Sequence, residues 1–423
     1  MISVALNRID NISIDDEWNF SDDTELLMHS IHAYPAKFPA FIASKAFEYA
    51  QEEGVATKSV ADIFCGCGTV ALEAKLHDKE FWGCDINPVA TLIAKTKSSN
   101  YKIDVLSSIY SRIVSAFAEI ECPEDAYAGG NERLRYWFTE KSYIDLFRLK
   151  QAIEDETKNG KYREAFFCIF SAILKSCSRW LTKSIKPQID PQKNEIDVCK
   201  AFELQYNKFV RAMTQVLESD INKNQIDIKN SNFLRINKLP KVDLIISSPP
   251  YVTSYEYADL HQLSTLWLGY ASDFRDVRKG SIGSIYNSED FQIDLMKLNS
   301  VGQDIVKELL NSRKATAKVR SVCRYYLDMQ RAIHRCSEML HNSGMVFFVV
   351  GDTEYKGVKI KNSEHLIQCL LDEGFTDIKA AKRRISNKLL TPYRDNIGRF
   401  SSDKSQRTIY HEEFIISGRM WRT

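Results

Sequence analysis

Residues 59–69 read Ser-Val-Ala-Asp-Ile-Phe-Cys-Gly-Cys-Gly-Thr, and they carry the clearest structural signal in the chain. A strand pattern over 59–64 runs into Gly66 and Gly68, which are spaced by one residue, and we expect a helix to begin at Thr69. Glycine lets the backbone approach a ligand closely, and the first turn of a helix offers free N–H groups. The stretch therefore predicts a strand, a ligand-binding turn and a helix in succession.

A second strand is expected at 80–85, and it ends in an acidic residue, Asp85, 23 residues after Asp62. A carboxylate in this place can accept hydrogen bonds from the two hydroxyls of a ribose. The two glycines alone also fit a plain tight turn, but strand, glycines, helix and acidic strand end together favour a nucleoside-binding site. The third glycine of a dinucleotide fingerprint is absent, which argues against NAD and FAD.

Strands and helices alternate around this unit. Helices are expected at 42–51, 69–76 and 89–97 and strands at 59–64 and 80–85, a pattern typical of a parallel, doubly wound sheet of the α/β class. The region 103–228 is predicted to be a helical insertion, because apolar residues recur at helical spacing over 163–181. The expected fold is completed by strands at 242–247 and 345–350, a helix at 324–340 closed at 342–344, and a last α/β stretch at 363–416.

The composition is that of a globular protein of near-zero net charge. The chain has 423 residues, 44% of them hydrophobic, with 57 Lys and Arg against 56 Asp and Glu. This length predicts two or three domains, or one large domain with insertions. The acidic stretch 10–25 is expected to be a solvated arm. The ten cysteines form no Cys-x-x-Cys pair and the eight histidines show no metal-binding spacing, so no metal is expected. Neither a signal peptide nor an apolar run of membrane-spanning length is visible, which favours a cytoplasmic protein with no membrane partner.

A second motif follows the strand at 242–247, where the chain continues as Ser248-Pro249-Pro250-Tyr251. Consecutive prolines fix the backbone and remove its donors, which leaves the carbonyls as rigid acceptors. The serine hydroxyl adds a polar contact, and the tyrosine offers a flat face on which a base can stack. Such a turn can hold an exocyclic amino group by accepting its hydrogens, although a strand-ending turn with a packed tyrosine is the plainer interpretation.

The two motifs together resemble a known family. Asp-x-Phe-x-Gly-x-Gly-Thr at 62–69 followed by Ser-Pro-Pro-Tyr is similar to the S-adenosylmethionine-dependent DNA methyltransferases that modify exocyclic amino groups. The segment 32–39, His-Ala-Tyr-Pro-Ala-Lys-Phe-Pro, looks like the segment before the cofactor loop in the cytosine-N4 branch. Residues 325–329 and 344–352 also look like family landmarks, so the resemblance spans about residues 29–400, with the insertion only loosely matched.

This resemblance implies a Rossmann-like methyltransferase sheet with S-adenosyl-L-methionine as its cofactor. Asp85 would hold the ribose hydroxyls and Ile86 would pack on the adenine. The cofactor-binding residues carried over from the family are Tyr34, Lys37, Asp62, Phe64, Gly66, Gly68, Thr69, Asp85 and Ile86. Many family members contact the adenine amino group with an acidic residue where this chain has Asn-Ser-Asn-Phe at 230–233, so that contact is missing or is made by Asn or Ser.

The resemblance assigns the target-base pocket and the catalytic role to Ser248, Pro249, Pro250 and Tyr251. It implies direct in-line transfer to the amino nitrogen of a base flipped out of duplex DNA, with Tyr251 as its stacking partner. Serine at the first position of the motif favours N4 of cytosine over N6 of adenine. A carbon-5 cytosine methylase is excluded because none of the ten prolines is followed by cysteine, and we interpret Cys65 and Cys67 as small packing residues. His32, in the segment 32–39, is a candidate to lie near the active site.

Family analogy also implies duplex DNA as the partner and a role as the modification enzyme of a restriction-modification system, with a cognate restriction endonuclease encoded nearby. Three alternatives stay open: an adenine-N6 DNA methyltransferase, an RNA methyltransferase, and a catalytically silent DNA-binding protein. The oligomeric state is not predicted.

Three basic clusters are candidates for contact with DNA phosphates. Residues 379–407 hold nine Lys and Arg against two Asp, 313–324 hold five basic residues and no acid, and the insertion contributes Lys175, Arg179, Lys183 and Lys186. A solvated face explains each cluster equally well. The DNA-binding candidates from the first two clusters are Lys382, Arg383, Arg384, Lys388, Arg394, Arg399, Lys314, Lys318 and Arg320.

These patterns divide the chain into six parts. They predict an N-terminal arm at 1–28, the cofactor-binding half of the methyltransferase domain at 29–102, the helical insertion at 103–228, the catalytic half at 229–269, a target-recognition insert at 270–322, and the rest of the sheet with a basic DNA-contact loop at 323–423.

Overall fold

A computed structural model describes residues 1–4, 9, 11–19, 25–35, 37–217, 225–252, 257–284, 291–311, 316–355, 357–385, 393–394, 403, 407–408 and 412–421. Its central sheet contains, in spatial order, β1 (Ile2–Ser3), β9 (Phe375–Arg384), β12 (Glu412–Met420), β6 (Leu340–Val350), β5 (Val242–Ser247), β2 (Ser59–Asp62), β3 (Glu80–Asp85) and β4 (Ile226–Asn230). The strands from β6 to β4 run parallel to one another, whereas β12 runs antiparallel to both β6 and β9. The predicted α/β class with a doubly wound, mainly parallel sheet is confirmed.

The order of the strands reverses between β2 and β5. From β2 the chain moves to β3 on one side, and it returns much later as β5 on the other side of β2. Ligands of open α/β sheets bind at the carboxyl ends of the strands where such a reversal occurs. The glycine loop follows β2 and Ser248 follows β5, so the sheet brings both sequence motifs to one edge.

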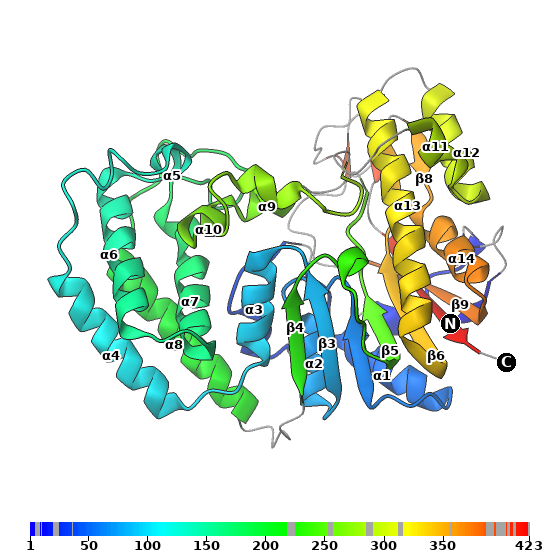
Figure 1. The fold of residues 1–423 in the computed structure, drawn as a ribbon, viewed down its shortest axis with the longest axis horizontal. Coiled ribbons are helices and arrows are strands. Elements are labelled where there is room, and N and C mark those ends of the chain that lie inside the picture. The colour runs from blue at the N-terminus through cyan, green and yellow to red at the C-terminus, as the bar shows by residue number, and fades with distance from the viewer. Residues whose placement is uncertain are drawn as a thin grey trace.

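Helices cover both faces of the sheet (Figure 1). Val60 in β2 belongs to the apolar core that also contains residues of α1 (Ala40–Glu52) and α2 (Thr69–Leu76). The next residue, Ala61, belongs to the opposite core, with residues of α13 (Thr316–Met339) and α14 (Asn362–Asp372). Because successive side chains of a strand point to opposite faces, the apolar residues of each central strand pack alternately into the two cores.

A bundle of helices stands beside α3 (Pro88–Ser98) and the β4 edge of the sheet (Figure 1). It comprises α4 (Ile103–Glu119), α5 (Glu132–Trp137), α6 (Glu140–Glu156), α7 (Lys161–Cys177) and α8 (Val198–Leu217). These helices share an apolar core with α3, and α10 (Gln262–Trp267), which follows α9 (Tyr257–Leu260), also contributes to it. The helices of the predicted insertion are therefore present, but they end before residue 228, because β4 begins at Ile226 and pairs with β3.

The chain between α10 and the next central strand packs partly on the sheet layers. It contains η5 (Phe274–Arg278), α11 (Phe291–Met296) and α12 (Ser300–Asn311), and residues of α12 share the apolar core of α13. Helix α13 begins at Thr316, earlier than predicted. It ends at Met339, one residue from the predicted end, but residues 342–344, which were expected to close it, lie inside β6, where the pairing with β5 shifts register between Val242 and Leu244.

The N-terminal stretch is part of the fold, so the prediction of a solvated arm was wrong. Strand β1 pairs with β9, and Ile14 forms a parallel bridge with Lys382. Trp18, at the end of η2 (Asp16–Trp18), is 1% exposed and packs against Tyr49 and Phe347. Apolar residues between the acidic ones, Trp18 above all, find partners far along the chain.

The remaining short elements are η3 (Leu27–Ser30), η4 (Phe233–Arg235), β7 (Thr353–Tyr355), β8 (Val358–Ile360), β10 (Tyr393–Arg394) and β11 (Arg407–Thr408). Among the described residues, no helix has the length and apolar character needed to cross a membrane.

Candidate active site

Two glycines shape the loop between β2 and α2. Gly66 and Gly68 have φ angles of +46° and +76°, in the left-handed region that other residues disfavour. A Cβ on Gly68 would lie 2.6 Å from the Cβ of Ala94 in α3. Over Gly66 lies Tyr34, whose hydroxyl would be 3.4 Å from a Cβ at that position. The loop thus packs tightly against α3, and the segment before α1 brings Tyr34 to it.

Asp85 ties the glycine loop to the end of β3. Its Oδ2 accepts a hydrogen bond of 2.9 Å from the Gly66 N–H, and its Oδ1 accepts one of 2.8 Å from the Asn87 N–H. Burial raises the pKa of this carboxyl, and the backbone donors at Asn87 and Gly66 oppose the rise. Each carboxylate oxygen keeps a further lone pair, so a pair of ligand hydroxyls can still be accepted here.

Ile86 and the asparagines of 230–233 form a wall beside Asp85. A Cβ on Gly280 would lie 3.2 Å from Cδ1 of Ile86, so the chain after η5 packs against this side chain. Asn232 donates through Nδ2 to the Gly280 carbonyl at 2.9 Å and accepts from the Leu234 N–H at 2.8 Å. Asn230 donates to the carbonyls of Asp85 and Ile86, at 3.1 Å each. Both asparagines of 230–233 therefore bind backbone groups and shape the site's wall.

His261, which the sequence motifs did not mark, belongs to the same site. Its Nδ1 lies 2.7 Å from Asn87 Nδ2, and its ring centroid is 5.0 Å from that of Tyr34. Burial lowers the pKa of His261 to about 3, so the ring is neutral, and because Nδ1 accepts from Asn87 the proton is on Nε2. Among the described residues this Nε2 has no hydrogen-bond partner, although the residue is only 4% exposed. An asparagine before Pro88 is a helix-start signal that could have indicated Asn87, but His261 has no local signal.

Asp62 joins the two sequence motifs. Its Oδ1 accepts from the Ser247 hydroxyl at 2.6 Å and from the Phe64 N–H at 3.1 Å. Burial raises the pKa of Asp62 to about 7, and these two hydrogen bonds oppose the rise. The end of β2 is thereby fastened to the last residue of β5, directly before Ser248.

The Ser-Pro-Pro-Tyr turn is held by the strands beside it. Ser248 donates its hydroxyl proton to the Val349 carbonyl in β6 at 3.0 Å, so its oxygen lone pairs remain available to accept. Tyr251 donates to Glu413 Oε2 in β12 at 2.9 Å. A Cβ on Gly351 would lie 3.0 Å from Cε2 of Tyr251, so the absence of a side chain there makes room for the ring.

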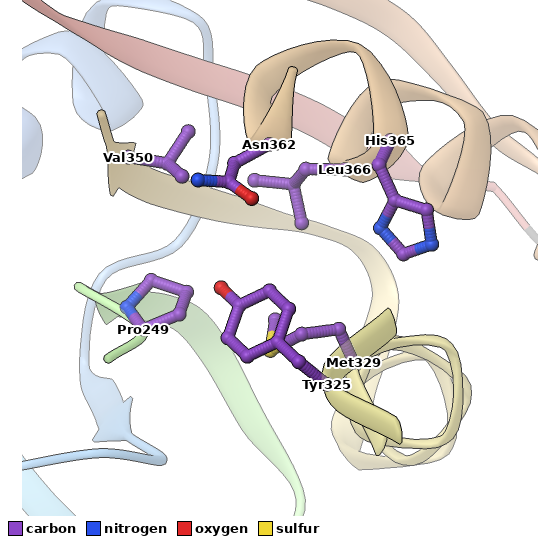
Figure 2. Close-up of a pocket in the computed structure, with 7 residues that line it drawn as sticks. All are labelled: Pro249, Tyr325, Met329, Val350, Asn362, His365 and Leu366. Atoms are coloured by element: carbon purple, nitrogen blue, oxygen red, sulfur yellow. The ribbon is translucent and has the colours of Figure 1, made fainter. Parts of the chain in front are cut away.

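A small cavity lies behind this turn (Figure 2). It is lined by Pro249, Tyr325, Met329, Val350, Asn362, His365 and Leu366. In Figure 2 the hydroxyl of Tyr325 is directed toward the space between Pro249 and Asn362. Asn362 donates to the Gly351 carbonyl at 2.9 Å, which connects the start of α14 to the end of β6. Tyr325 and Met329, two of the landmark residues, therefore lie close to the turn.

His32 is engaged in a buried polar network. Its Nδ1 donates to the Ala33 carbonyl at 2.9 Å, so its Nε2 accepts from the Ser171 hydroxyl at 2.8 Å. Since the Ser171 proton is used there, Ser264 donates to Ser171 at 2.6 Å. Burial lowers the pKa of His32 to about 4. The network links the segment 32–39 to α7 and α10, and with both nitrogens occupied His32 has a structural role.

The remaining predicted cofactor residues are Thr69, Phe64 and Lys37, and no described contact joins Lys37 to the glycine loop. Thr69 is buried at the start of α2, and the Phe64 ring lies edge-on to Phe233, with 6.4 Å between centroids. Lys37 pairs with Glu25 at 2.5 Å. Cys65 and Cys67 are both buried, which fits the packing role expected of them.

The basic clusters are only partly available to a ligand. Arg383 is 2% exposed, pairs with Glu413 and donates to the Trp18 carbonyl, so the prediction that it contacts DNA was wrong. Its position on a strand that alternates between faces explains the error. Lys382 lies 3.9 Å from Glu412 and over the Phe414 ring, whereas Arg384 is exposed.

In the second cluster Arg320 is exposed and Lys318 is partly buried, while Arg324 pairs with Asp328 at 3.0 Å. In the insertion, Lys175 donates to backbone carbonyls at 182 and 184, and Arg179 to those at 135 and 136, so both are structural. Of the remaining candidates, Lys314, Lys388 and Arg399 lie outside the described residues, and Arg394 is described only as part of β10. No group of three or more potential metal ligands occurs among the described residues.

Comparison with known proteins gives one relative of similar length. The chain is 25% identical over 397 residues to the Type II methyltransferase M.MvaI of Kocuria varians, and the match covers 86% of each chain. No family model matches the chain.

Solved structures align along most of the chain but with low scores. The rRNA methyltransferase aviRa from Streptomyces viridochromogenes gives a TM-score of 0.29 at 8% identity, over 94% of this chain and 90% of that one. The precorrin-6y methyltransferase from Geobacter metallireducens gives a TM-score of 0.31 at 8% identity, over 97% of this chain and 98% of that one. The fold assignment therefore rests on the strand order of this chain itself. That strand order, the glycine loop with its acidic neighbour, and the similarity to a methyltransferase along most of both chains together support an S-adenosylmethionine-dependent methyltransferase.

Proposed function

We propose that this protein methylates the exocyclic N4 amino group of cytosine in duplex DNA at specific sites. The observation that carries the proposal is the hydrogen bond between Asp62 and Ser247, which fastens the cofactor loop to the Ser-Pro-Pro-Tyr turn at one edge of the sheet. A methyl donor on the loop and an amino group in the turn would therefore meet without a large movement of the chain. The name of the relative, a Type II methyltransferase, supports DNA as the substrate.

The residues of the loop fit a nucleoside cofactor. The oxygens of Asp85 keep lone pairs for two ribose hydroxyls, Ile86 offers an apolar surface for an adenine, and Gly66 permits close approach of the backbone. The buried Nε2–H of His261 has no partner within the described part of the chain and can donate to a further polar group of the ligand. S-adenosylmethionine, when bound, supplies an electrophilic methyl group on a sulfonium.

The turn fits an amino group as the acceptor of that methyl. The Ser248 hydroxyl donates its hydrogen bond to the Val349 carbonyl, so its oxygen can accept one from a ligand, and the prolines hold the Pro249 carbonyl rigidly. Hydrogen bonds from the amino group to these acceptors would draw its lone pair away from conjugation with the ring and orient it for in-line attack. Tyr251 provides the stacking face for a base that has left the helix.

Serine in the first position of the turn supports cytosine over adenine. The modification role in a restriction-modification system, with a cognate endonuclease, is carried over from the family resemblance. In Figure 1 the insertion bundle stands beside the β4 edge and α11 and α12 lie beyond α13, so both are candidates for reading the DNA site. Exposed Arg384 and Arg320 are the described basic residues that best support phosphate contact.

Transfer of tritium from labelled S-adenosylmethionine tests this proposal. Purified protein is incubated separately with mixed-sequence duplex DNA and with tRNA, and acid-insoluble label is counted. We expect label in the duplex and none in the tRNA. Label in the tRNA alone would favour an RNA methyltransferase, and cofactor binding without transfer to either would favour a silent binding protein.

A further inference from the structure

The hydroxyl of Tyr251 is anchored on a strand far along the chain. It donates to Glu413 Oε2 in β12 at 2.9 Å, while the ring lies against the backbone of Gly351 at the end of β6. Because the hydroxyl is hydrogen-bonded to a strand of the sheet and the ring edge meets the backbone of another, few positions are open to the ring. Tyr251 is therefore held at its polar end by β12 and along its edge by β6.

Glu413 is itself held by a buried cation. Its Oε1 pairs with Arg383 in β9, and Arg383 donates through Nε to the Trp18 carbonyl at 2.8 Å and through a terminal nitrogen to the Asn19 carbonyl at 3.3 Å. The guanidinium also lies over the Phe41 ring, 5.4 Å from its centroid. A buried carboxylate that is paired and fully hydrogen-bonded has few alternative positions. The chain Tyr251–Glu413–Arg383 therefore connects the turn to the N-terminal stretch.

We propose that Glu413 is a positioning residue that fixes the Tyr251 ring as a ready stacking surface for the flipped base. This inference rests on the proposed role of Tyr251 in the base pocket. A ring that is already ordered loses less conformational freedom when the base arrives, and the methyl transfer step benefits because the base is held in one place. Arg383 and the backbone at 18–19 complete the support by holding the Glu413 carboxylate.

The competing explanation is that the Glu413–Arg383 pair only stabilises the fold and has no effect on Tyr251. Strand β9, which carries Arg383, offers a control for this explanation. Lys379 in β9 pairs with Glu53 at 2.8 Å, a contact of the same chemical type between β9 and the end of α1. Neither residue contacts Tyr251 in any described interaction. Glu53→Gln therefore removes an ion pair from β9 without touching the anchor of Tyr251.

The experiment measures methylation of mixed-sequence plasmid DNA by wild type, Tyr251→Phe, Glu413→Gln, their double variant, Tyr251→Ala and the control Glu53→Gln. The values determined are kcat, the KM for DNA, the Kd for S-adenosylmethionine and the melting temperature. We expect Tyr251→Phe and Glu413→Gln each to lower kcat about tenfold, the loss of one hydrogen bond to a charged group. The kcat of the double variant should be no lower than that of the less active single variant, because both substitutions remove the same anchor. The Kd for the cofactor should stay within about twofold of the wild-type value in every variant, since the anchor acts on the base side alone.

Two results would overturn the inference while leaving the proposed function in place. One is full kcat in Tyr251→Phe although Tyr251→Ala is inactive; the other is a double variant whose loss is the product of the two single losses. Because Tyr251→Phe leaves the Glu413–Arg383 pair intact, it decides the matter even if Glu413→Gln does not fold. Full transfer by Tyr251→Ala, or none by wild type, would instead overturn the base pocket itself and the inference with it.

Discussion

The Ser247 hydroxyl donates a 2.6 Å hydrogen bond to the Asp62 carboxylate, and this contact joins two segments that are 185 residues apart in the chain. One residue ends β2 before the glycine loop, and the other ends β5 before the Ser-Pro-Pro-Tyr turn. In the proposed reaction, the distance between the methyl donor and its acceptor would therefore be set by the spacing of two neighbouring strands of the sheet.

The buried Asp62 predicts a pH-dependent stability. Its pKa is raised by burial from 3.8 to about 7, so between these values the folded state binds the proton and the unfolded state releases it. Stability from this group is accordingly present at low pH and is lost as the pH rises through about 7. Asp62→Asn removes this dependence. Between pH 4.5 and pH 8 the free energy of unfolding of wild type should therefore fall by on the order of 3 kcal/mol relative to that of the variant.

Urea unfolding of both cofactor-free proteins at several pH values measures this difference. Glu80→Gln, which removes an exposed carboxylate from β3, is carried through the same series as a control. A difference between Asp62→Asn and wild type that stays constant with pH would contradict the raised pKa.

Replacing Asp85 should weaken cofactor binding. Asp85→Asn keeps the size of the side chain but replaces one acceptor oxygen by a donor, which opposes the N–H of Gly66 or Asn87 and leaves a ribose hydroxyl unmatched. We expect the Kd for S-adenosylmethionine, measured by calorimetry, to rise on the order of 10- to 100-fold. The control is Asp227→Asn in β4, whose carboxylate pairs with Lys229 away from the loop and whose loss should leave the Kd unchanged.

Gly68 should not tolerate a side chain. An alanine there would combine a φ of +76° with a Cβ only 2.6 Å from Ala94 Cβ, so either the loop or α3 must move. The expected loss of stability is about 3 kcal/mol or more, with loss of cofactor binding. At Gly374 the φ is +79°, but no heavy atom of the described residues lies within 4 Å of where a Cβ would be. Gly374→Ala should therefore lower the free energy of unfolding by only about 1–2 kcal/mol. Equal losses in thermal melting would show that strain in φ, and not the contact with α3, limits the position.

Ser248→Ala should separate catalysis from cofactor binding. The variant loses the oxygen proposed to accept from the target amino group, so we expect kcat to fall about 100-fold while the Kd for the cofactor stays unchanged. The control is Ser59→Ala, which removes a serine hydroxyl that donates to Asp243 where β2 and β5 begin, at the end of these strands away from the turn. This variant should keep the wild-type methylation rate. Methylation by Ser248→Ala at the wild-type rate would remove Ser248 from the mechanism.

Much of the fold could be predicted because its signals are local. The strand, glycine turn and helix at 59–76 and the strand before Ser248 are patterns within one short window, and the structure shows them close to the predicted bounds. The same holds for the helical insertion, whose apolar spacing is visible in α7. The meeting of both motifs at one edge then follows from the general behaviour of parallel sheets.

The errors come from contacts between residues far apart in the chain. Trp18 was assigned to a solvated arm because its neighbours are acidic, yet its partners Tyr49 and Phe347 lie elsewhere in the sequence. Arg383 was assigned to DNA because its neighbours are basic, yet Glu413 on the adjacent strand pairs with it. His261 was missed for the same reason: only the fold brings it to Asn87 and Tyr34.

Chromatography of the nucleosides from methylated DNA tests the central claim most directly. Duplex DNA is incubated with the protein and labelled S-adenosylmethionine, digested completely, and the labelled nucleoside is identified by its retention and mass. The site described here predicts label in 4-methylcytosine. Label in 6-methyladenine would keep the fold and the pocket but contradict the assignment of the base from Ser248, and the absence of label from every nucleoside of the DNA would contradict the proposed function.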